Sequence, residues 1–113
     1  MAERGDVMMF TSRIGFGAGT EGERAIVVQA TPLNSTLPTL LAVPLDVAAD
    51  PYLGADLLVR VAADEAGTRN DQVAVPTHIR FVRRDRFAPG RVGRLRPKTL
   101  AELDEKLRLV LDL

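Results

Sequence analysis

Short runs of apolar and β-branched residues, separated by turn-forming residues, cover most of this chain. Runs of four to eight such residues between turns are typical of β-strands. In the stretch around Leu57 to Val61, apolar positions alternate with Leu58 and Arg60, as in a half-buried strand. The pattern predicts strands at residues 6–10, 25–30, 39–43, 56–62, 72–75, 78–82 and 91–95.

The segments between these runs have the composition of loops and turns. Residues 11–23 contain Gly15, Gly17, Gly19 and Gly22 and are expected to form a mobile loop. Pro44 should end the third strand, because proline lacks the N–H that a central strand needs. A loop is then expected at 46–53, and turns are expected at 31–36 and 64–71.

Helical periodicity begins only near the end of the chain. Pro97 suits the first turn of a helix, and Thr99 with Glu102 has the spacing of a capping box. The residues Leu100, Leu103, Leu107, Val110 and Leu111 then fall on one apolar stripe. Many short strands followed by one helix predict a mainly β fold, a small antiparallel barrel with a C-terminal helix packed on it. We expect one domain over residues 1–113.

Composition narrows the chemistry and the compartment. With 113 residues, 46% hydrophobic and 27% charged, the chain resembles an ordinary soluble globular protein. The absence of cysteine excludes disulfides, thiolate metal sites and cysteine nucleophiles. A single histidine argues against a zinc site, and we expect no metal and no cofactor. No signal peptide is recognisable and the apolar run 37–45 is too short to span a bilayer. We therefore expect a cytoplasmic protein without membrane contact.

Charge is distributed unevenly along a chain whose net charge is zero. Residues 80–98 contain eight basic side chains and one acid, a net charge of +7, whereas residues 1–79 carry −5 and residues 99–113 carry −2. This asymmetry suggests an anionic partner. The basic segment 80–98 can be interpreted as a surface that follows phosphates, or as a solvated turn with arginines pointing in many directions. With only Phe81 and Phe87 interleaved, base stacking along it is weakly supported.

Several short motifs occur in one order along the chain. They are Arg4-Gly5-Asp6-Val7, Arg24-Ala25-Ile26-Val27-Val28, Val43-Pro44-Leu45-Asp46, Thr77-His78-Ile79-Arg80-Phe81-Val82, and a tail from Val92 to Leu107. Their order and spacing resemble the PemK/MazF family of toxins from bacterial type II toxin–antitoxin modules. The resemblance covers nearly the whole chain, although no single motif is specific.

This resemblance carries expectations about fold and function. It implies a twisted antiparallel barrel of the CcdB/MazF-like kind, a homodimer, and metal-independent, sequence-specific endoribonuclease activity on single-stranded RNA. It also implies a cognate antitoxin whose disordered C-terminal tail occupies the RNA groove, and DNA binding together with that antitoxin.

Three residues are candidates for catalysis. Arg24 matches the catalytic arginine of the family, and a planar, permanently charged guanidinium suits phosphate; the alternative is a surface arginine paired with Glu21 or Glu23. Asp46 stands where the family usually has a threonine. It could act as a general base, repel phosphate, or simply open a loop. His78 has a free pKa near neutrality, but a lone histidine in a strand is more often structural.

Four further residues are candidates for RNA binding. Arg13 lies in the glycine-rich segment, Thr77 replaces an acid of some family members, and Arg80 matches a family arginine. Arg83 follows in the basic segment. Each could equally be a solvated surface residue.

Two functions remain open at this stage. In the first, the protein is a toxin endoribonuclease in which Arg24 stabilises the pentavalent phosphate and Asp46 or His78 transfers protons. In the second, catalysis is weakened or lost through Asp46, Thr77 and Ala25, which stands after Arg24 where the family pattern has a proline. The barrel would then act by binding an antitoxin or another partner.

Overall fold

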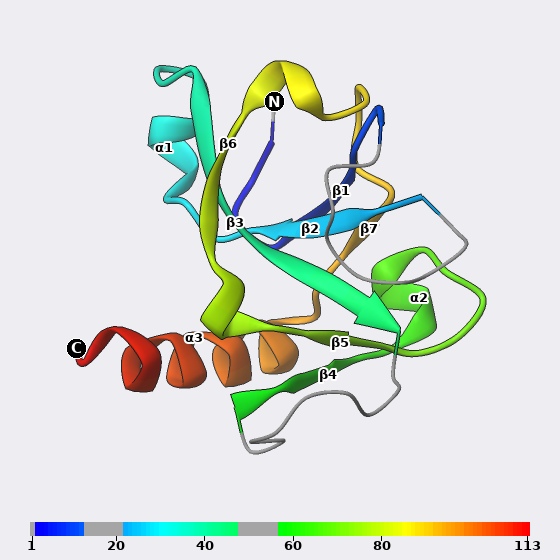
Figure 1. Cartoon of the computed structure of the whole chain (residues 1–113), viewed down its shortest axis with the longest axis vertical. Coiled ribbons are helices and arrows are strands. Elements are labelled where there is room, and N and C mark those ends of the chain that lie inside the picture. Colours follow the sequence, from blue (N-terminus) through cyan, green and yellow to red (C-terminus); the bar gives the residue numbers. More distant parts are fainter. Residues whose placement is uncertain (1, 13–21, 48–56) are drawn as a thin grey trace.

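Seven strands and three α-helices make up the described part of the chain, which a computed structural model gives for residues 2–12, 22–47 and 57–113 (Figure 1). Two 3₁₀ turns complete it. In order the elements are β1 Asp6–Met9, β2 Arg24–Val27, α1 Thr31–Asn34, β3 Thr39–Val47, β4 Val59–Val61, α2 Ala63–Ala66, β5 Gln72–Ala74, η2 Pro76–His78, β6 Arg80–Arg83, η3 Arg84–Arg86, β7 Gly93–Arg94 and α3 Pro97–Leu111.

The nine-residue strand β3 organises the sheet. The strands of the sheet lie in the order β4-β5-β3-β2-β1-β7, and every pairing is antiparallel. Strand β6 pairs with the first half of β3 and β5 pairs with its second half, so η2 lies where the chain passes from one to the other. The sheet curls into a half-barrel with α3 packed against it, which confirms the predicted fold class (Figure 1).

Side-chain alternation along the strands produces two apolar clusters, one on each face of the sheet. The larger cluster includes Ile26, Val43 and Leu45 and is covered by Leu103 and Leu107 of α3. The smaller one includes residues of the opposite parity, Ala25, Val27 and Ala42, together with Phe10 and Phe87. The rings of Phe10 and Phe87 stack with centroids 4.5 Å apart. Each ladder position can therefore be assigned to one face or the other.

Several local predictions about strands and turns were correct only in part. Strand β3 continues through Pro44, which pairs with Ala25. The Pro44 carbonyl accepts a hydrogen bond from the Val75 N–H, so the ladder lacks only the N–H donor that proline does not have. The predicted turn 64–71 does join two hairpin arms, β4 and β5, but the short helix α2 overlaps its start. The helix α1 occupies most of the predicted turn 31–36. His78 lies on the 3₁₀ turn η2 rather than in the strand, which begins at Arg80.

The C-terminal helix forms as predicted, but its start differs. It begins at Pro97, which occupies the first turn, and Arg96 is its N-cap residue without a side-chain cap. The Arg96 N–H instead donates to the Glu65 carboxylate at 2.7 Å, so a distant acid replaces the expected capping box. On the predicted stripe, Leu103 and Leu107 are buried and Leu111 is exposed.

The expected glycine-rich loop and the loop after β3 fall largely on residues 13–21 and 48–56, outside the described residues. None of the helices in the described ranges is long and apolar enough to cross a membrane.

Candidate active site

The start of β2 and the end of β3 meet at one end of the sheet, where two of the three predicted catalytic residues lie. Ala25 pairs with Pro44, and continuing this register by two residues places Glu23 opposite Asp46. The Phe10 N–H donates to the Glu23 carbonyl at 2.9 Å, so the ladder with β1 also continues through Glu23. Arg24 and Asp46 are therefore brought together at this end.

Backbone carbonyls, rather than acids, hold the Arg24 side chain in the described part of the structure. Its Nη1 donates to the Gly22 carbonyl at 2.6 Å and its Nη2 donates to the Gly67 carbonyl at 3.2 Å. Its Nε is buried and has no hydrogen-bond partner among the described residues. Carbonyls orient a guanidinium without neutralising it, so these two contacts leave the positive charge of Arg24 in place. Glu21, one of its two predicted partners, lies outside the described residues.

Two carboxylates are buried at this end of the sheet. Asp46 is 7% exposed and Glu23 is 8% exposed. Asp46 Oδ1 accepts a hydrogen bond from the Val47 N–H at 2.8 Å. Asp46 lies within β3, opposite Val73 of β5, and does not open a loop. Sequence reasoning treated Glu23 only as a surface partner for Arg24 and missed its burial.

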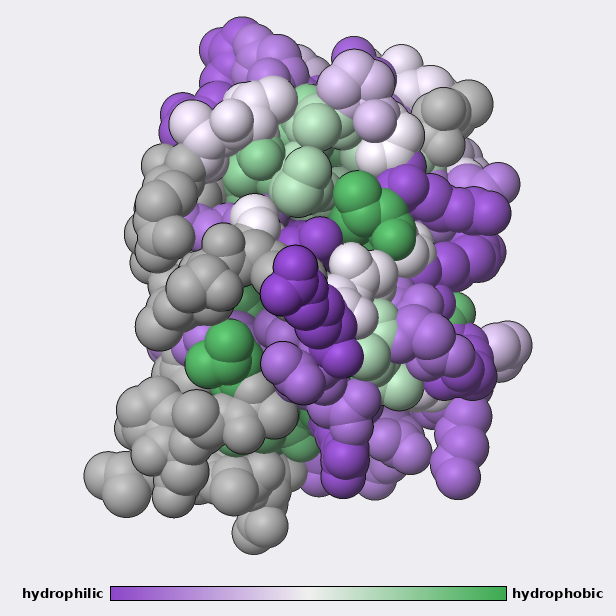
Figure 2. All heavy atoms as spheres, turned by 90° about the vertical axis from the view of Figure 1, so that its right-hand side faces the viewer, coloured by the Kyte–Doolittle hydropathy of each residue, from purple (hydrophilic) through white to green (hydrophobic). Residues whose placement is uncertain are grey.

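The side chains of Arg24 and Asp46 start on opposite faces of the sheet. By alternation Arg24 shares its face with Ile26 and Leu45, whereas Asp46 shares its face with Ala25. A phosphate in contact with both groups must therefore sit at the end of the sheet, around the edge formed where β2 begins and β3 ends. Figure 2 shows this side of the molecule, with hydrophilic side chains gathered across its middle and along one flank.

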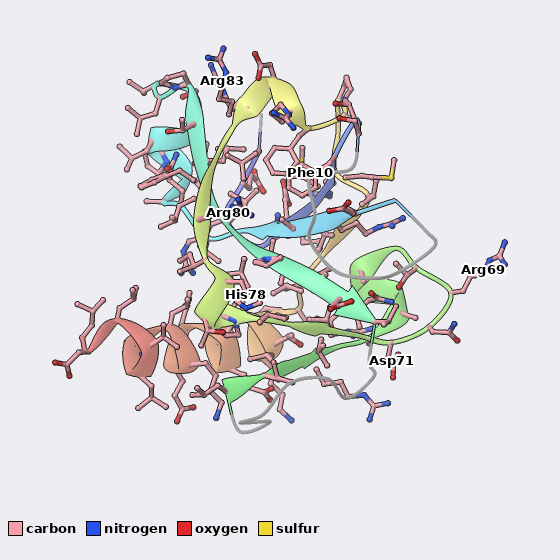
Figure 3. All side chains as sticks on the ribbon, viewed as in Figure 1. Phe10, Arg69, Asp71, His78, Arg80 and Arg83 are labelled. Carbon is pink, nitrogen blue, oxygen red and sulfur yellow. The ribbon has the colours of Figure 1, made fainter. Side chains whose placement is uncertain are left out.

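The other predicted residues in the described ranges lie on η2 and on β6, the strand that pairs with the first half of β3. Thr77 and His78 are exposed on η2 at the bend beside α3, and Arg80 and Arg83 lie further along β6 (Figure 3). Ala42, the partner of Arg80, is four residues from Asp46 on β3, a separation of about 13 Å. Within the described residues, the Arg24 side chain donates to Gly22 and Gly67 and not to His78. Arg13 lies outside the described residues.

Arg80 and Arg83 differ in face and in partner. Arg80 pairs with Ala42 and so shares its face with Asp46, whereas Arg83 pairs with Thr39 on the opposite face. Arg83 also forms an ion pair with Asp85 at 3.1 Å. The Asp85 hydrogen bond raises the pKa of Arg83, and the same bond lowers the pKa of the Asp85 carboxyl. Arg80 is consequently the better placed of the two to meet a strand that also reaches Asp46.

Three arginines of the basic segment 80–98 are bound to acids that lie before this segment in the chain. Asp6, 3% exposed, accepts from Arg94 at 2.6 Å and from Arg91 at 3.4 Å. Arg96 pairs with Asp64 and with the buried Glu65. These contacts show that three of the arginines stabilise the fold by joining segments far apart in the sequence.

The structure also contains a hollow of about 500 Å³ away from the Arg24 end. It is lined by Asp6, Met8, Leu40, Arg84, Phe87 and Arg91, among others, and by none of the predicted site residues. Within the described ranges, no three histidine or carboxylate side chains are grouped closely enough to hold a metal ion.

A family model described as the PemK-like, MazF-like toxin of type II toxin–antitoxin systems matches residues 3–111. The chain belongs to this family. A search of curated protein sequences finds no match.

Solved structures agree on the fold. An endoribonuclease from mycobacterial species, in complex with its cognate antitoxin, superposes with a TM-score of 0.77 at 16% identity over 100% of this chain and 97% of the other. MazF from Deinococcus radiodurans gives a TM-score of 0.76 at 22% identity over 99% and 97%. Mycobacterium tuberculosis toxin MazF-mt6 gives 0.73 at 13% identity over 96% and 97%. At these identities the likeness establishes the MazF-like fold and nothing finer.

Proposed function

We propose that this PemK/MazF-like toxin is an endoribonuclease that cuts single-stranded RNA at defined sequences without a metal ion. In this reaction the 2′-hydroxyl loses a proton and attacks the adjacent phosphorus. The bond to the 5′-oxygen then breaks, and that oxygen takes a proton from water. The products are a 2′,3′-cyclic phosphate and a free 5′-hydroxyl. Two groups are needed most, a base for the 2′-hydroxyl and a cation beside the pentavalent phosphate.

The orientation of Arg24 is the observation that carries this proposal. A guanidinium held by the carbonyls of Gly22 and Gly67, with no acid bound to it in the described structure, is a preorganised cation. We assign stabilisation of the phosphorane to Arg24 and proton abstraction to Asp46, the carboxylate at the same end of the sheet.

The remaining residues are assigned to RNA contact. Thr77, His78 and Arg80 follow one another past the bend into β6 and are exposed, so an RNA strand running from Asp46 along the face of β3 would reach them. We assign His78 to this contact rather than to proton transfer, because it is exposed on η2 next to Thr77 and close in sequence to Arg80. Arg13 is proposed to contact RNA from the glycine-rich segment.

We also propose two partners in the cytoplasm. The mycobacterial endoribonuclease similar in fold is in complex with an antitoxin, and we infer that an antitoxin tail covers the RNA groove of this protein as well, with the pair binding DNA together. Exposed apolar side chains on β6 and at the end of α3, including Phe81, Leu109 and Leu113, are candidates for a homodimer contact.

The test is incubation of the pure protein with long mixed-sequence RNA, with and without EDTA, followed by mapping of the cut ends. We expect cuts at a defined sequence, unaffected by EDTA, that leave cyclic phosphates. Arg24→Ala should abolish them with the fold retained by circular dichroism. Arg60→Ala removes one exposed arginine from β4 and serves as the charge-matched control, which should cut normally. Unchanged cutting by Arg24→Ala contradicts the role assigned to this residue.

One observation favours a second function, a barrel that binds a partner with little catalysis. Asp46 is a buried carboxylate where a phosphate must approach, and like charges repel strongly in a site of low dielectric constant. If Asp46→Thr raises cleavage at least tenfold from a barely detectable level, the native protein belongs to this second class. If it lowers cleavage, Asp46 is the base.

A further inference from the structure

The guanidinium of Arg24 is tied across 43 residues of sequence to the end of a four-residue helix. Its Nη2 donates to the carbonyl of Gly67, which follows α2, while its Nη1 donates to Gly22 near the start of β2. A planar guanidinium held at two of its nitrogens by fixed carbonyls can neither tilt nor swing freely. The position of α2 therefore determines where the charge of Arg24 lies.

Two glycines fix α2 against the segment that leads into β7. Gly67 has a φ of +71°, and a Cβ there would lie 2.2 Å from the Val92 carbonyl oxygen. A Cβ on Gly93 would lie 2.0 Å from the Glu65 carbonyl oxygen. Two backbones approach this closely only where both residues lack a side chain. The Gly67 carbonyl is thus part of a tightly packed backbone junction, not of a free loop.

A buried acid holds the same helix from the other side. Glu65 is 4% exposed, and its carboxylate accepts from the Ala62 N–H at 3.1 Å and from the Arg96 N–H at 2.7 Å. Its Oε1 also lies 3.3 Å from Nη1 of Arg96. One carboxylate therefore accepts hydrogen bonds from the N-cap N–H groups of both α2 and α3, and so links α2 to the C-terminal helix. Figure 1 shows α2 at the same end of the sheet as the start of β2.

We propose that α2 is a positioning element for Arg24, with the Gly67 carbonyl as the contact and Glu65 as the residue that keeps this carbonyl in place. The proposal rests on the proposed function, in which Arg24 stabilises the pentavalent phosphate. Displacement of α2 leaves the charge in the site but lets the guanidinium rotate away from the transition state. Turnover then falls while affinity for the RNA ground state changes little, because ground-state binding depends on many contacts.

The chain offers a closely matched pair of variants. Glu65→Gln keeps the size of the side chain but puts an amide against the donors of Arg96. Asp64→Asn removes the neighbouring carboxylate that pairs with the same arginine from an exposed position. We expect Glu65→Gln to lower kcat at least tenfold with KM within about twofold, and Asp64→Asn to match the native protein. Should Glu65→Gln fail to fold, Arg96→Gln tests the ion-pair part of the link and leaves the backbone hydrogen bond of residue 96 intact.

An NMR readout separates this inference from the proposed activity. The buried Nε–H of Arg24 should give a slowly exchanging ¹H–¹⁵N signal, assigned by its loss in Arg24→Lys. We expect the signal to shift or broaden in Glu65→Gln and to stay in place in Asp64→Asn. A native protein that cuts no RNA defeats the proposed function, while the signal still decides whether α2 positions Arg24. An unmoved signal in Glu65→Gln overturns the positioning role, whether or not kcat falls.

Discussion

Two groups of arginines in this protein have different kinds of partners. Arg91, Arg94 and Arg96, in the basic segment 80–98, bind acids that lie earlier in the chain, including the buried Asp6 and Glu65. Arg24, in the more acidic part, binds two backbone carbonyls in the described structure. An ion pair with an acid neutralises the guanidinium and links two segments of the fold. A hydrogen bond to a carbonyl orients the guanidinium and leaves its charge unpaired. For these four arginines the partner, rather than the local density of charge, separates those that hold the fold from the candidate catalytic one.

The sharpest test of this comparison is the same conservative change at both kinds of site. Lysine keeps the charge but loses the planar fork of donors. Arg24→Lys should lower RNA cleavage roughly 100-fold, the cost of misplacing one oriented donor beside a developing charge. Arg94→Lys should leave cleavage per folded molecule unchanged. Single-turnover cleavage rates at saturating protein measure both, and equal losses would remove the distinction between the two groups.

A change at the acid should have the reverse effect, on stability and not on activity. Asp6→Ala leaves Arg91 and Arg94 without their shared carboxylate and should lower the free energy of unfolding by about 2 kcal/mol. This is less than for a fully buried pair, because both arginines are about half exposed. Urea unfolding gives the value. A loss under about 0.5 kcal/mol would mean that these contacts do not hold the fold.

Within β6, the comparison predicts unequal effects on RNA affinity. Arg80→Ala should weaken binding and lower the slope of log affinity against log salt by about 0.7, the value for one phosphate contact to a single strand. Arg83→Ala should leave the slope unchanged, because Arg83 lies on the other face and pairs with Asp85. Fluorescence titration with 2′-O-methyl RNA avoids cleavage during the measurement. Equal slopes for both variants would contradict the assignment of faces.

The smallest effect concerns pH and a surface pair. The hydrogen bond from Arg60, and then that from the Ala63 N–H, lower the pKa of Asp71 below its usual 3.8. A carboxyl with a depressed folded pKa contributes stability above pH 3.8 and loses it as the pH falls through the folded value. Asp71→Asn should therefore lower the urea midpoint slightly at pH 5 and not at pH 2. A pH-independent difference would exclude this cause.

The sequence predicted the elements that depend on local pattern. Alternating apolar residues gave the strands, and the stripe containing Leu103 and Leu107 gave the final helix, since both patterns follow from burying one face. Prediction from sequence failed where a contact with a residue far away in the chain takes the place of the expected local interaction. Glu65 takes the place of the Thr99 capping box, and the continuing ladder carries β3 past Pro44. The helix α2 was missed, although Ala66-Gly67 is a common helix ending.

The sequence by itself determined the family, the half-barrel and the candidate Arg24, because motif order and periodicity are properties of the chain alone. Only the tertiary structure decided which arginines are tied to acids and that Glu23 and Asp46 are both buried. Only the tertiary structure also placed His78 on a 3₁₀ turn and the end of α2 against Arg24. Those relations depend on strand register and on close backbone approaches such as Gly67 to Val92, which join residues far apart in the sequence and leave no local pattern.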